Sequence, residues 1–274
     1  MQKKYELIEE TINKCGHKKL YRIRALKDFN DVKIGDVGGY VEKEDNLSHT
    51  GNAWIYDNAI VCENAKIYGD ARICDDAYIG GNAEIYNSAE ISKNANVYRN
   101  AKVFENAKVH GDAKVEGNAS VYGNSRIFGH AWICGNALIY DTAKLCEEAR
   151  ISGNTRIYGD CFIRGNTQIS GNAKVFANAW LHTNAQIFGN ASISDPSDYI
   201  ILEGFGTEYR TSTFYRCDDG SVGVACGCFV GTLDEFRARV NSTRSGKVAE
   251  EYTLIAYLAE RHFMKDPVMN SEVI

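Results

Sequence analysis

A six-residue phrase, Asn-Ala-x-Ile/Val-x-x, repeats from Asn52 to Asp195 without an insertion or a deletion. It is plain in NAWIYD from Asn52, NAKVFE from Asn100 and NAQIFG from Asn184, and 24 copies fill the 144 residues. A short period repeated this often predicts a solenoid, in which each unit buries its apolar side only against its neighbours.

Each copy has two positions suited to an interior. The fourth is aliphatic in every copy, and the second is alanine in all but Ser125, Thr155, Cys161 and Thr167. Inward positions two residues apart have the period of a β-strand. The first position is Asn or Asp in 20 copies, and Gly precedes it in 13. Because these residue types favour turns, each copy is predicted to be a short strand followed by a corner.

The outward fifth position indicates how many sides a coil has. In every third copy it is aromatic, at Tyr68, Tyr86, Phe104, Tyr122, Tyr140, Tyr158 and Phe176. This 18-residue spacing predicts a coil with three sides that stacks the rings along one edge. The fold class expected is therefore an all-β solenoid, a triangular parallel β-helix built from about 8 such coils, with a small C-terminal α+β module.

The repeat resembles the hexapeptide-repeat family, whose coils are left-handed triangular β-helices and whose best-known members are trimeric acyltransferases. The resemblance implies a left-handed coil. The run ALKDFNDVKIGDVGGYVEKEDNLS is also similar to the start of hexapeptide-repeat proteins of bacterial, prophage and phage genomes, which are often described only as transferases. After the aliphatic residue, where the family usually has a small or acidic residue, this chain often has Tyr, Phe, Cys, His or Arg.

Three segments are expected along the chain: a β cap over residues 1–50, the β-helix over 51–196 and the α+β module over 197–274. The cap is predicted to cover the open first coil, and Pro196 to end the solenoid because proline cannot donate to a further ladder. Strands are expected at 5–9, 20–26, 32–41, 199–202, 209–216 and 222–230, a turn at 218–220, and helices from Thr232 and over 248–263.

Composition excludes several classes of protein. The N-terminus MQKKYELIEE lacks the apolar core of a signal peptide, and no run of 18 apolar residues predicts a membrane span. Nine cysteines without an export signal suggest reduced thiols in a cytoplasm, which by the phage resemblance is that of a bacterial host. The net charge of −5 argues against general nucleic-acid binding.

Basic residues are expected to gather on one face within a few coils. They are Lys108, His110, Arg126, Lys144 and Arg164. Two interpretations stay open: a solvated, salt-bridged face that discourages aggregation, or a binding site for an anionic small molecule or an acidic protein partner.

Hexapeptide acyltransferases commonly use a histidine as base beside a loop excursion, so the histidines of the repeat are weak catalytic candidates. They are His110, His182 and His130. None has an acidic neighbour fixed by obvious spacing, and no copy carries an excursion. No cofactor or metal is predicted, although Cys217, Cys226, Cys228 and His262 give a weak alternative as zinc ligands.

The function predicted is a non-catalytic, rigid binding scaffold. The phage and prophage resemblance implies a host protein or a nucleotide signal as its target, as for an inhibitor of a bacterial defence system. The alternative is a hexapeptide-repeat acyltransferase that uses acyl-CoA. The seven aromatic residues of the edge are expected to form the interface of a homo-oligomer, a dimer or trimer, because contiguous exposed apolar patches mark interfaces.

Overall fold

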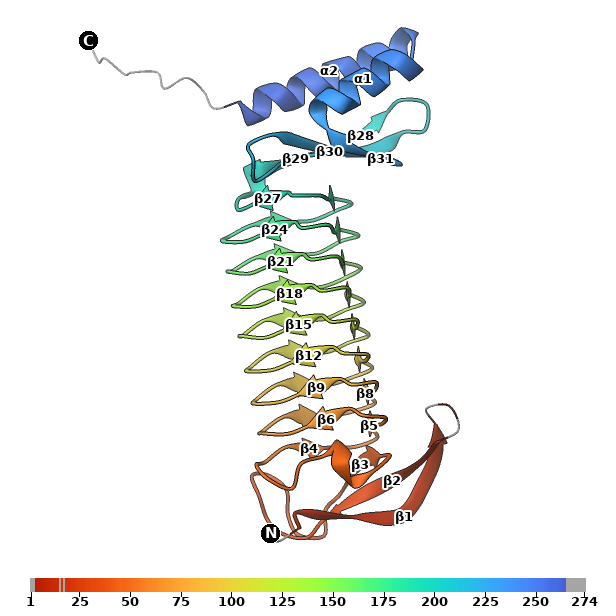
Figure 1. Cartoon of the computed structure of the whole chain (residues 1–274), viewed down its shortest axis with the longest axis vertical. Helices are drawn as coiled ribbons and strands as arrows, with labels where there is room; N and C mark the ends of the chain where they lie inside the picture. Colours follow the sequence, from red (N-terminus) through yellow and green to blue (C-terminus); the bar gives the residue numbers. More distant parts are fainter. Residues whose placement is uncertain (1–2, 15, 17, 265–274) are drawn as a thin grey trace, which may run out of the picture.

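The computed structural model describes residues 3–14, 16 and 18–264 (Figure 1). A tall three-sided column carries a β-hairpin at its N-terminal end and a sheet with two helices at its C-terminal end (Figure 1). Twenty-four two-residue strands, β4 to β27, build the column, one from each copy of the phrase.

The strands form three parallel stacks. Stack one contains β4 Trp54–Ile55, β7 Arg72–Ile73, β10 Glu90–Ile91, β13 Lys108–Val109, β16 Arg126–Ile127, β19 Lys144–Leu145, β22 Phe162–Ile163 and β25 Trp180–Leu181. Stack two contains β5 Ile60–Val61, β8 Tyr78–Ile79, β11 Asn96–Val97, β14 Lys114–Val115, β17 Trp132–Ile133, β20 Arg150–Ile151, β23 Gln168–Ile169 and β26 Gln186–Ile187. Stack three contains β6 Lys66–Ile67, β9 Glu84–Ile85, β12 Lys102–Val103, β15 Ser120–Val121, β18 Leu138–Ile139, β21 Arg156–Ile157, β24 Lys174–Val175 and β27 Ser192–Ile193.

Every strand of the column pairs with the strand three copies of the phrase away, as Lys108 pairs with Arg126, so the three-sided, 18-residue coil is confirmed. The N-terminal segment adds to two stacks, through Tyr40 beside Ile60 and Leu47 beside Ile67. The solenoid therefore has about nine turns rather than the eight expected. Its left-handedness stays a prediction from the resemblance.

The interior is built as the phrase predicts. All 24 fourth-position side chains are at most 1% exposed, and every second-position residue is fully buried. The four exceptions to alanine each donate to the carbonyl three residues earlier, at 2.6 to 2.8 Å: Ser125, Thr155, Cys161 and Thr167. These polar side chains are therefore satisfied inside an apolar core.

At each corner the two turn residues have different roles, which the sequence did not indicate. Positive φ falls on the residue before the Asn, whether it is Gly135 (φ 70°), Lys93 (φ 60°) or Thr183 (φ 56°). The Asn side chains of one corner form a ladder instead, each Nδ2 donating to the Oδ1 of the next coil. The ladder runs through Asn64, Asn82, Asn100, Asn118, Asn136, Asn154, Asn172 and Asn190.

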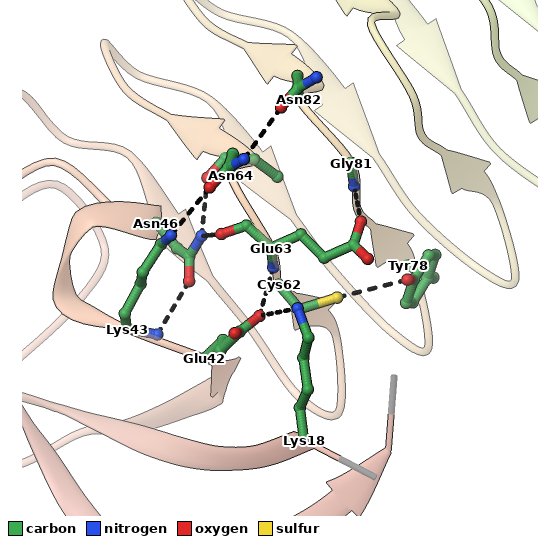
Figure 2. Close-up of polar contacts among 11 residues, drawn as sticks. Lys18, Glu42, Lys43, Asn46, Cys62, Glu63, Asn64, Tyr78, Gly81 and Asn82 are labelled. Atoms are coloured by element: carbon green, nitrogen blue, oxygen red, sulfur yellow. Dashed lines mark hydrogen bonds and ion pairs between the residues drawn. The ribbon is translucent and has the colours of Figure 1, made fainter. Parts of the chain in front are cut away.

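The N-terminal segment consists of β1 Tyr5–Lys14, β2 Lys18–Ala25, β3 Val37–Val41 and the short helix η1 Glu44–Asn46. Figure 2 shows how it joins the first coils. Lys43 Nζ donates to Asn64 Oδ1 at 3.0 Å and so begins the Asn ladder, while Asn46 Nδ2 donates to the carbonyls of Glu63 and Ala65. Glu42 accepts from the Glu63 amide at 2.6 Å.

The C-terminal segment begins with η2 Pro196–Asp198, so the solenoid ends at the predicted proline. Its elements are β28 Tyr199–Phe205, β29 Arg210–Arg216, β30 Val222–Cys226, β31 Phe229–Thr232, α1 Leu233–Thr243 and α2 Gly246–Phe263. One face of this sheet covers the last coil, with Tyr215 packed in the core of the solenoid. The other face packs Phe214 against both helices.

Several sequence predictions outside the repeat were wrong in detail. The first strand, expected at 5–9, extends to Lys14, because it pairs along its length with β2. The strand expected at 32–41 begins only at Val37, because Val32 closes a tight turn with Phe29. The run 222–230 is two strands, since Gly227 at φ 60° turns the chain between them. The helical spacing of Tyr252, Ile255 and Ala259 predicts that Leu258 shares their buried side of the second helix, but Leu258 is 53% exposed. Neither helix of the described residues is long and apolar enough to cross a membrane.

Candidate binding face on the solenoid

A basic row crosses stack one at three consecutive coils. Lys108, Arg126 and Lys144 occupy the outward third position of β13, β16 and β19, and the strands pair in register. All three side chains are exposed. The repeat places them there because third positions one coil apart must lie above one another on adjacent strands, about 4.8 Å apart.

Carboxylates neutralise this row unevenly. Lys108 Nζ lies 2.7 Å from Glu90 on the preceding coil, and Lys144 Nζ lies 3.9 Å from Asp160. Among the described residues, no carboxylate lies within ion-pair distance of Arg126. The middle of the row therefore carries the positive charge that the structure leaves least compensated.

Aromatic rings continue the row after Lys144. Phe162 and Trp180 take the third position of β22 and β25, and the Trp180 side chain is 45% exposed. The guanidinium of Arg164, at the adjoining corner, lies 5.4 Å from the Trp180 ring and 5.9 Å from the Phe162 ring. Within the part of the chain that the structure describes, Arg164 thus makes cation–π contacts and has no carboxylate at ion-pair distance.

Phe162 and Trp180 were not predicted as members of this face. The signal was present, since both stand at third positions that continue the 18-residue series of Lys108. We call the five third-position residues together with Arg164 the basic–aromatic face. They are Lys108, Arg126, Lys144, Phe162, Trp180 and Arg164.

His110, which was predicted as a member of the basic face, lies at the corner beside it, with its ring stacked on Phe128 at 5.3 Å. Burial lowers the pKa of His110, and the charges of Arg126 and Lys108 lower it further against the opposing effect of Glu90. The imidazole is therefore largely neutral at pH 7, and it adds a ring rather than a charge.

The histidine candidates for catalysis are not brought together. His182 is on the same corner as His110 but four coils further on, where its Nδ1 contacts Thr183 Oγ1 at 3.0 Å. His130 is on another corner, and its Nδ1 lies 3.6 Å from Asp112 Oδ2. Asp112 precedes His130 by one full coil, so the coil spacing itself identifies this acidic neighbour, which the sequence analysis missed.

Around His130 the surface of stack two is hollowed over about 550 Å³, with Trp132 and Glu148 among the lining residues. The Trp132 indole is fixed by donating to the buried carboxylate of Glu116 at 2.8 Å. The His130–Asp112 separation is longer than a hydrogen bond, and both side chains are at least half exposed. The pair is an ion pair when His130 is protonated, and it lacks the fixed geometry of a general base.

The seven rings of the aromatic edge stack as the spacing predicts. Consecutive centroids lie 4.8 to 5.3 Å apart and the planes differ by no more than 11°. All seven side chains are partly exposed, because stacking covers the ring faces and leaves the outer edges open.

The candidate zinc ligands do not come together around one centre. Among the described residues, no group of three or more His, Cys, Asp or Glu side chains is placed to hold a metal ion. Cys226 accepts from Ser212 Oγ at 3.1 Å, and His262 Nε2 contacts the Ser197 carbonyl at 2.9 Å.

No family model matches the chain. A stretch of 66 residues is 46% identical to the uncharacterized acetyltransferase YdcK of Escherichia coli (strain K12), a match that covers 21% of this chain and 20% of that protein. The chain thus spans about a fifth of the length of this curated relative. The local match and the three-sided β-solenoid together fit a hexapeptide-repeat, acyltransferase-like family.

Proposed function

We propose that this protein is a rigid, non-catalytic binding scaffold whose basic–aromatic face holds an anionic partner. The observation that carries the proposal is the in-register row of Lys108, Arg126 and Lys144. Like charges directly opposite one another on adjacent strands are destabilising, by up to about 1 kcal/mol for each pair. An anionic group laid across the row would relieve this repulsion, and Arg126 offers it a guanidinium without a carboxylate partner among the described residues.

The aromatic part of the face requires more of the partner than negative charge. Trp180 presents an exposed indole that Arg164 already contacts. Aromatic rings and arginine are the residues most enriched in binding hot spots. The partner we expect therefore combines anionic groups with an apolar or planar group.

The resemblance to phage and prophage proteins extends the proposal to a biological target. It favours a host protein or a nucleotide signal as the partner, and inhibition of a bacterial defence system as the role. These two partners differ in size, since a host protein is a macromolecule and a nucleotide signal is a small molecule.

The proposal is tested by reversing charge on the face. We expect Arg126→Glu with Lys144→Glu to weaken capture of the partner from bacterial lysate by about tenfold or more, and raising the salt concentration to weaken it in the wild type. The matched control is Lys247→Glu with Arg261→Glu, which makes the same charge change on α2, away from the basic–aromatic face and from the hollow around His130. Equal capture by all three proteins, independent of salt, would leave only a solvated face.

The second candidate is an acyltransferase that uses acyl-CoA. It is favoured by the name of the partial relative and by the hollow of about 550 Å³ in whose lining His130 lies. We expect such an enzyme to bind acetyl-CoA and to lose transfer in the variant His130→Ala, with His182→Ala as the control. A wild-type protein that does not bind acetyl-CoA would remove this candidate.

A further inference from the structure

A second pocket, of about 240 Å³, lies in the C-terminal segment and is separate from the basic–aromatic face. It is bounded by the chain before β29, by the β30–β31 turn and by both helices. Three arginines, Arg210, Arg239 and Arg244, are in its lining, and Glu208 is the one carboxylate that the described residues place there. The pocket is therefore rich in positive charge although the whole chain is acidic.

These arginines differ from others in the same segment. Arg237, also on α1, pairs with Glu260 at 2.7 Å, and Arg216 pairs with Asp198 at 2.9 Å. Within the described part of the chain, no carboxylate, Glu208 included, lies within ion-pair distance of any of the three arginines in the pocket. Their guanidinium groups are free to receive an anion.

A turn glycine makes room for one of them. A Cβ at Gly227 would lie 2.6 Å from Arg210 Nη1 and 2.8 Å from its Cδ. Gly227 also has φ 60°, which disfavours other residues. The tight β30–β31 turn thus lets the Arg210 side chain lie across it, at the pocket.

The inner wall of the pocket is apolar and well packed. Phe229 and Phe236 have ring centroids 5.5 Å apart, and Val240 continues this wall along α1. Tyr252 and Cys226 are less than 9% exposed, and Ser212 donates to the Cys226 sulfur at 3.1 Å. Because the side chains of this wall pack against one another, the apolar part of the pocket is preformed.

We infer that this pocket binds a small phosphorylated organic molecule, with the phosphate against the three arginines and an apolar or ring portion against Phe229 and Val240. A phosphate monoester carries about −1.5 to −2 charges at pH 7 and three strong acceptor oxygens, which matches three guanidinium forks. A carboxylate has two oxygens and one charge, which a single bidentate arginine satisfies. The volume restricts the ligand to a compact one.

Titration of the full chain with phenyl phosphate, followed by calorimetry and by the amide NMR signals of Gly227 and Phe229, tests this inference. We expect phenyl phosphate to bind more tightly than benzoate or inorganic phosphate. Arg239→Gln with Arg244→Gln should weaken its binding by about tenfold or more. Arg261→Gln, which removes an arginine of α2 outside the pocket lining, should leave binding unchanged.

Three outcomes would overturn the inference. Wild-type protein that does not bind phenyl phosphate at millimolar concentration has no such site. Benzoate bound as tightly as phenyl phosphate would refute the assignment to phosphate. An equal loss of binding in Arg261→Gln and in the double variant would indicate general attraction to positive charge. None of these results depends on the basic–aromatic face, so the proposed function is tested separately.

Discussion

Lys4 is a fully buried lysine at the N-terminal end of the solenoid. Its Nζ donates to the Ala53 carbonyl at 2.8 Å and lies 5.2 Å from the Phe29 ring centroid. Burial, helped by the nearby charge of Lys27, lowers the pKa of Lys4 to about 8, whereas the unfolded chain has about 10.4. The folded state therefore releases this proton at lower pH than the unfolded state, and the ammonium form costs stability below pH 8.

Because the pKa of Lys4 is lower in the folded state, the stability of the protein should depend on pH. As pH rises from 8 to 10, the penalty of burying the ammonium disappears, and the wild type should gain about 2 kcal/mol of unfolding free energy relative to Lys4→Met. Denaturant melts of both proteins at pH 8, 9 and 10 measure this difference in unfolding free energy. Taking the difference cancels the titration of tyrosines and cysteines, because both proteins contain them. A constant difference over this range would mean that Lys4 keeps an ordinary pKa in the folded protein.

The elements of the column could be predicted from sequence, and those at its ends only in part. In the repeat, the same strand pattern occurs in 24 copies. The register follows from the 18-residue series, which also places Lys108 beside Arg126. The terminal segments have no period to correct an error. An apolar run such as 222–230 does not show that Gly227 divides it, and an apolar residue such as Leu258 does not show that its side of α2 faces solvent.

The N-terminal strands are expected to protect the open edge of the first coil. Strand β3 pairs with β5, and the ring of Tyr5 is fully buried against Trp54 at the first coil. Deleting residues 1–50 would expose that edge and its apolar side chains. We expect aggregation or loss of cooperative melting, because open strand edges template further pairing.

A milder variant separates packing from edge protection. Tyr5→Ala keeps the strands but removes a buried ring whose hydroxyl shares its one proton between the carbonyls of Glu44 and Leu47. It should cost about 3–5 kcal/mol while the protein stays soluble. A truncated protein that is soluble and melts like the wild type would show that residues 1–50 do not protect the first coil.

At the scale of the whole molecule, the column presents its stacked aromatic edge along seven coils. With adjacent strands about 4.8 Å apart, the six intervals between the rings make a strip roughly 30 Å long. The C-terminal sheet and helices lie on the end of the column rather than along the edge (Figure 1). Contiguous apolar strips of this extent usually mark an interface, and a second copy of the chain offers an equally long and regular strip.

We therefore predict that the wild-type protein is a dimer or trimer joined through the aromatic edge. Phe104→Lys with Tyr122→Lys, at the middle of the strip, should give a folded monomer, because burying two ammonium groups opposes association while their outward position leaves the core intact. Ser152→Lys with Ser170→Lys adds the same charge at the fifth position of another corner and should leave the oligomer unchanged. Light scattering measures the mass of all three proteins. A wild type that is monomeric at high concentration would refute self-association, and the exposed ring edges would then be the place to look for a different partner.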